Sequence, residues 1–197
     1  MKKGRLEAFS DGVLAIIITI MVLELKIPEG SDFKALLPVF PIFLSYVLSF
    51  IYLSIYWNNH HHLLHTFQKV SGGIMWANMH LLFWLSLVPV TTGWIGKYHD
   101  APVPTAIYGI NLFMAAVSYY ILQMTIIARH GQNSLLARAL GKDIKGKISI
   151  IAYLAAIPGA FINTWISFAV YALVALMWLI PDKRIEHALS EFEKAED

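Results

Sequence analysis

Four histidines about a third of the way along the chain are the residues whose type and spacing most directly suggest chemistry. They are His60, His61, His62 and His65. On a helix, His61 and His65 share one face, which is the spacing of many metal-binding histidine pairs. No carboxylate lies near them in the sequence to complete a ligand set, and an HExxH pattern is absent. We therefore expect a polar cluster at a helix end, with no metal ion and no cofactor.

A carboxylate near the start of the chain is the second candidate. Asp11 precedes an apolar run, residues 12–23, that is only 12 residues long. If Asp11 capped a helix beginning just after it, that helix would fall short of the roughly 20 residues needed to cross a membrane. The helix must therefore extend over about residues 6–27. Asp11 is then expected to be a buried carboxylate whose partner is Arg5, a histidine of the second span or Trp57.

The composition places these residues in a membrane protein. The chain has 197 residues, of which 57% are apolar and 14% charged, against about 45–50% and 25% in soluble domains. The net charge of +2 excludes a basic protein that binds nucleic acid. The absence of cysteine excludes a disulfide scaffold, a thiolate metal site and a cysteine nucleophile. We expect an all-α integral membrane protein whose solvent is the lipid bilayer.

Long charge-free runs mark the other spans. They are residues 35–68, 70–96, 101–128 and 148–181. The first three give one span each. The fourth would measure about 51 Å as one helix, against a hydrocarbon core of about 30 Å, so a split near Pro158 or Asn163 is expected. Residues 1–181 would then form one six-span domain, followed by a short charged cytoplasmic tail, residues 182–197.

The distribution of basic residues predicts the orientation of these spans. With six spans and the N-terminus inside, 12 of the 15 Lys and Arg residues fall in inside segments and 3 in outside segments. Cytoplasmic segments of membrane proteins carry such an excess. We therefore expect a multi-pass protein of the cell membrane with both termini in the cytoplasm.

The first helix is expected to have two unlike sides. At about 100° per residue, one side carries bulky apolar side chains and a single hydroxyl. Its residues are Phe9, Ile16, Thr19, Ile20 and Leu23. Ser10 and Asp11 fall on the opposite side. Taken alone, the apolar side is typical of contact with lipid or with other helices.

The start of this helix resembles a known family. Residues 5–13, RLEAFSDGV, fit the R-x-x-x-F-S-D signature of the transmembrane protein 175 family. The resemblance continues through Thr19 to Glu24, and the six-span layout and the length look like those of a prokaryotic member. It implies a potassium-permeable cation channel rather than an enzyme. It also implies a homotetramer with the first helix around a central pore, because this chain has room for one six-helix repeat.

The resemblance also implies roles for single residues. A hydrophobic constriction with a threonine layer would be formed by Ile16, Thr19, Ile20 and Leu23. A network that holds the pore helix against its neighbours would include Arg5, Phe9, Ser10 and Asp11. A tryptophan and a histidine of the second span join this network in relatives. Here the candidates are Trp57 and either His60 or His61.

A secondary transporter is the alternative function. Asp11 or His80, which is expected at membrane depth in the third span, would then couple or relay ions. Such a protein is expected to show inverted repeats or broken helices. No internal repeat is visible in the sequence.

Overall fold

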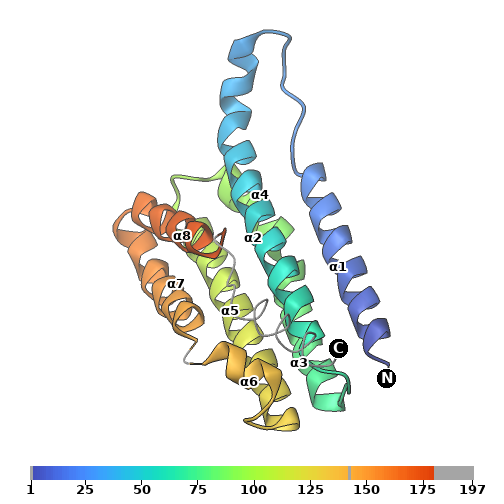
Figure 1. Ribbon diagram of the computed structural model, residues 1–197. Coiled ribbons are helices and arrows are strands. Elements are labelled where there is room, and N and C mark those ends of the chain that lie inside the picture. The colour runs from blue at the N-terminus through green and yellow to red at the C-terminus, as the bar shows by residue number, and fades with distance from the viewer. Residues whose placement is uncertain (1, 142, 180–197) are drawn as a thin grey trace.

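The computed structural model describes residues 2–141 and 143–179, and this part of the chain is almost entirely helical (Figure 1). The helices are α1 (Lys3–Leu23), η1 (Phe33–Val39), α2 (Phe40–His65), α3 (Gly72–Ser86), α4 (Val88–Lys97), α5 (Pro102–His130), α6 (Leu135–Leu140), α7 (Ile144–Ile162) and α8 (Thr164–Leu179), of which η1 is a 3-10 helix. The predicted all-α class is confirmed. The predicted tail, residues 182–197, lies outside the described residues.

The helices have the length and composition of a multi-pass membrane protein. Among the described residues, five stretches are long and apolar enough to cross a membrane: Lys3–Leu23, Phe33–His65, Gly72–Lys97, Pro102–His130 and Ile144–Ile162. Helix α8 is apolar but has only 16 described residues. At 1.5 Å per residue it measures about 24 Å, so a sixth full span stays a prediction.

Breaks in the helices fall partly where the sequence predicts them. The last apolar run divides at Asn163, whose backbone is extended, while Pro158 stays inside α7. The one span expected over residues 70–96 is confirmed as the apolar stretch Gly72–Lys97, although its helix is interrupted at Leu87, between α3 and α4. Pro89 stands in the first turn of α4, where its missing N–H costs no hydrogen bond. The first helix begins at Lys3 and ends at Leu23, four residues before the expected end.

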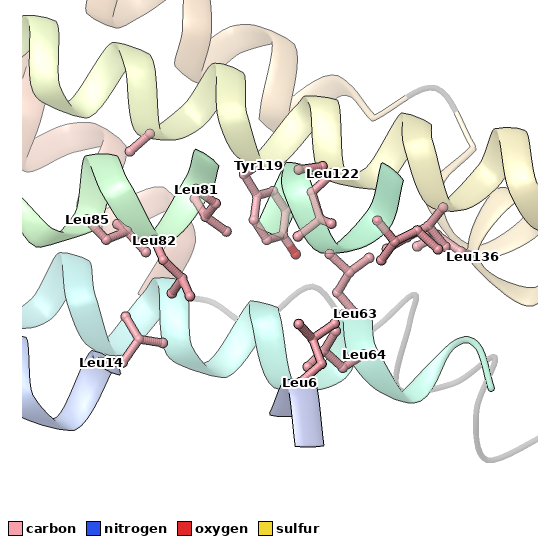
Figure 2. Packing of buried hydrophobic residues seen from close by; sticks show 14 of the residues in the cluster. Leu6, Leu14, Leu63, Leu64, Leu81, Leu82, Leu85, Tyr119, Leu122 and Leu136 are labelled. Carbon is pink, nitrogen blue, oxygen red and sulfur yellow. The ribbon is translucent and has the colours of Figure 1, made fainter. Parts of the chain in front are cut away.

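Two hydrophobic clusters hold the bundle together. The larger one joins α1, α2, α3, α5 and α6, and leucines such as Leu14, Leu63, Leu81 and Leu122 interdigitate there (Figure 2). The second joins α2, α5, α7 and α8 around four buried tyrosines, Tyr52, Tyr108, Tyr153 and Tyr171. Helix α5 takes part in both clusters and contacts α3, α4, α7 and α8.

Helix α1 lies at the edge of the bundle and uses one side for packing. Its buried residues are Leu6, Ser10, Leu14, Ile17 and Met21. Their spacing of three or four residues follows the turn of the helix, so they form one continuous strip. This strip packs on α2, α3 and α4. The opposite side of α1 is therefore left uncovered by the described part of the chain.

Candidate pore helix and its supporting network

The uncovered side of α1 carries an apolar stripe along its length. We use this name for Phe9, Ile16, Thr19, Ile20 and Leu23, which are all exposed. Ile16 is 58% exposed and Leu23 is 80% exposed, far above the values of core residues. Apolar surface of this kind on a membrane helix contacts lipid or another protein chain.

Thr19 supplies the hydroxyl of the stripe. Its Oγ1 donates to the backbone oxygen of Ile16 at 2.9 Å, so the hydroxyl proton is satisfied within the helix. Thr19 itself is exposed. Glu24, just beyond the stripe, packs closely on Gly93 of α4: a Cβ atom added to that glycine would stand only 2.7 Å from the glutamate Oε2. None of the five stripe residues carries a charge.

Asp11 is held on the other side of α1 by a residue of α2. Trp57 Nε1 donates to Asp11 Oδ1 at 3.0 Å. Hydrogen bonds to an ionised acceptor are stronger than neutral ones, and this one joins the two helices. Asp11 is half-buried rather than fully buried as expected, because it lies at the margin of the α1 packing strip. Trp57 was among its predicted partners.

A fully buried chain of side chains joins α1, α2 and α3. Asn78 Nδ2 donates to Ser10 Oγ at 2.9 Å, and Ser10 Oγ in turn donates to the backbone oxygen of Leu6 at 2.8 Å. Asn78 Oδ1 lies 2.6 Å from His60 Nε2. Because that amide oxygen can only accept, His60 carries its proton on Nε2. His60 is thus the histidine that is linked, through Asn78, to the signature residue Ser10.

Asn78 is the member of this network that sequence reasoning missed. It lies about midway along the apolar helix α3. A buried amide surrounded by apolar residues needs hydrogen-bond partners, since leaving it unpaired is costly. Its position in a span was the available signal, but nothing local indicated which residues it would contact.

His61 takes a different position from His60. Its ring stacks on Trp57 with 6.0 Å between ring centroids, and its Nδ1 lies 3.7 Å from Glu7 Oε1. His65 Nε2 lies 3.3 Å from the same oxygen of Glu7. A carboxylate therefore does stand beside these two histidines, although none lies near them in the sequence. Glu7 is distant in sequence, and the pairing of α1 with α2 brings it there.

Two signature residues are not brought into the network by the fold of one chain. Arg5 and Phe9 are both exposed, and Phe9 belongs to the apolar stripe. His80, the other residue of the transporter alternative, is half-buried and bonded within α3, where it accepts a hydrogen bond from Trp84 Nε1 at 3.0 Å.

Comparisons with known proteins show what this chain is similar to. A family model described as the endosomal/lysosomal potassium channel TMEM175 matches residues 5–89, which include the whole network described above. A potassium channel of Chryseobacterium sp. strain P1-3 is 60% identical, over 97% of this chain and 100% of that protein. A potassium channel of Chamaesiphon minutus is 30% identical, over 90% of this chain and 93% of that protein.

A solved structure extends the similarity to the fold. The crystal structure of a lysosomal potassium-selective channel TMEM175 homolog from Chamaesiphon minutus superposes with a TM-score of 0.79 at 28% identity. The match covers 91% of this chain and 97% of that one. Signature residues, full-length relatives and fold lead to one conclusion: the chain belongs to the TMEM175 family of ion channels.

Proposed function

We propose that the protein is a potassium-permeable cation channel of the cell membrane, in which four chains surround a pore lined by their α1 helices. The observation that carries this proposal is the uncharged apolar stripe, exposed along the helix that also bears the family signature. The bacterial relatives named as potassium channels support the choice of ion.

The assembly follows from the geometry of α1. One stripe cannot enclose a pore, whereas identical stripes related by a closed rotation form a ring. Small residues flank the stripe on its exposed side: Ala8, Gly12 and Ala15. Small side chains let neighbouring helices of a membrane protein approach closely. This pattern favours contact with other α1 helices over contact with lipid alone.

The constriction is assigned to side-chain bulk rather than to fixed charge. Ile16, Ile20 and Leu23 offer no oxygen atoms, so an ion passing them keeps its water or loses it without compensation. A ring of such side chains repels water and closes the pore by dewetting. A narrow open ring favours potassium, because the larger ion gives up hydration water more readily than sodium. The Thr19 hydroxyl offsets part of that loss when its oxygen turns toward the ion.

The cytoplasmic side is assigned to the end of the bundle where α1 begins and α2 ends. Lys2, Lys3, Arg5 and Lys69 lie at these helix ends. An excess of basic residues marks the cytoplasmic side. The Asp11 and His60 contacts then hold α1 near its cytoplasmic half, while Leu23 lies toward the opposite side of the membrane.

Flux through purified protein in liposomes tests this function. Under a potassium gradient we expect passive potassium flux with unitary currents in single-channel recordings. Ile16→Asn should wet the ring and raise the resting leak. Leu173→Asn is the matched control, because Leu173 is an exposed apolar residue of α8, a helix that does not belong to the proposed pore. Slow coupled flux without unitary currents would argue for the transporter alternative. Equal leak in the Ile16→Asn and Leu173→Asn variants would argue for another pore.

A further inference from the structure

Three potential metal ligands converge where α1 and α2 meet. Glu7 comes from the second turn of α1, and His61 and His65 come from the last two turns of α2. These helix ends lie side by side at the end of the bundle where the chain begins (Figure 1). One ligand atom from each of the three residues lies within 4.8 Å of the other two. The two histidines occupy one helix face, and the carboxylate stands opposite them.

The distances suit a small tetrahedral ion. A Zn²⁺ ion with bonds of about 2.0–2.1 Å to nitrogen and oxygen holds its ligand atoms about 3.3 Å apart. Glu7 Oε1 lies 3.3 Å from His65 Nε2 and 3.7 Å from His61 Nδ1. The three ligand atoms lie within 4.8 Å of one another, so rotation of the side chains has to bring the two histidine rings closer together around an ion.

The cluster is also accessible and of suitable charge. All three side chains are partly exposed at a helix end, so water can enter and complete the coordination. The charged and titratable groups near His65 are Lys3 and Glu7 on α1 and His61 and His62 on α2. The carboxylate of Glu7 offsets the charge of Lys3. The unprotonated imidazole is the form of histidine that binds metal.

We propose that Glu7, His61 and His65 form a binding site for a divalent transition-metal ion, for which Zn²⁺ is the best match. Two imidazoles and one carboxylate make a donor set that Zn²⁺ accepts, with water in the remaining position. The ion would link α1 to α2 through bonds stronger than the present contacts between Glu7 and the two histidines. It would also restrain the ring of His61, which stacks on Trp57 and so borders the Asp11 hydrogen bond.

Zinc binding to the purified full-length protein tests this site without reference to ion conduction. The tag-free protein is stripped with EDTA in detergent and titrated with ZnCl₂, and bound zinc is measured by equilibrium dialysis. One zinc ion per chain should bind, and the unfolding temperature should rise with zinc concentration because only the folded chain presents all three ligands. Loss of a residue that only hydrogen-bonds to a metal ligand typically weakens metal affinity about 10- to 100-fold. His65→Ala and Glu7→Gln remove a ligand itself, so each should weaken zinc affinity at least tenfold.

His62→Ala is the matched control. His62 belongs to the same turn of α2 but lies outside the three-residue cluster, so its variant should bind zinc like the unchanged protein. Unfolding temperatures measured in EDTA show whether each variant folds, and Glu7→Gln preserves the size of the side chain. No zinc binding, binding unaffected by His65→Ala and Glu7→Gln, or an equal loss in His62→Ala would overturn the proposal.

Discussion

Trp57 Nε1 donates to Asp11 Oδ1 across 3.0 Å, and so ties the indole of α2 to the signature carboxylate of α1. Asp11 lies at the margin of the side of α1 that packs on the bundle, whereas Ile16 lies on the uncovered side. The two sides of α1 therefore have different roles. Its polar signature residue faces a neighbouring helix of the same chain, and its bulky apolar residues face outward.

Asp11→Ala should destabilise the folded protein. The change removes a charge-assisted hydrogen bond of the kind that contributes about 1.5–3 kcal/mol, and half-exposure places the effect near the lower end. We expect a lower unfolding temperature in detergent and less assembled protein, with potassium over sodium selectivity unchanged in whatever assembles. Trp57→Phe should cause a similar loss, and the double variant should lose less than the sum. Normal assembly with altered selectivity alone would place Asp11 in the conduction path.

Asn78→Leu should destabilise the folded protein more than the small difference in volume between the two side chains suggests. It leaves Ser10 without one partner and His60 without the acceptor for its Nε2 proton, both in a buried site. An unsatisfied buried group costs about 1–3 kcal/mol. Asn59→Leu is the control, because the Asn59 side chain bonds to the backbone oxygen of Ile55 within its own helix. Denaturation in detergent measures the stability of both variants. Equal losses would show that the hydrogen bonds between helices contribute no more than the bond of Asn59 within its own helix.

Shortening the side chains of the stripe should change conduction. Ile16→Ala and Leu23→Ala widen the proposed ring, so conductance should rise and discrimination against sodium should weaken. Ile20→Ala should have a smaller effect, since Ile20 sits slightly off the centre of the stripe. Reversal potentials under mixed potassium and sodium gradients report the change. Unchanged currents and reversal potentials in both the Ile16 and Leu23 variants would mean that α1 does not line the pore.

The chain should form a tetramer in detergent. In the proposed channel, four copies of α1 related by a closed rotation surround the pore, and their exposed stripes face the pore instead of lipid. Native mass measurement or crosslinking should report four subunits of 22.2 kDa each. A stable monomer that still conducts potassium would exclude this assembly.

Much of α1 could be predicted from the sequence because helical phase depends only on residue spacing. The apolar stripe and the opposite placement of Ser10 and Asp11 follow from a rotation of about 100° per residue. The break at Asn163 also follows from local signals. These are an apolar run that is too long for one span and residues near its middle that disfavour a helix. The interruption of the helix at Leu87 had only Pro89 as its signal in the sequence, and a proline in a first helical turn does not by itself show where the preceding helix ends.

The sequence by itself determined the class of the protein through its apolar spans and through a first helix that carries a signature and an apolar stripe. All of these are properties of composition and local period. Only the tertiary structure decided that Asn78 joins Ser10 to His60, and that Glu7 meets His61 and His65. These contacts depend on the relative depth and rotation of α1, α2 and α3. The packing of buried leucines at their interfaces sets both, and residues far apart along the chain contribute to it together.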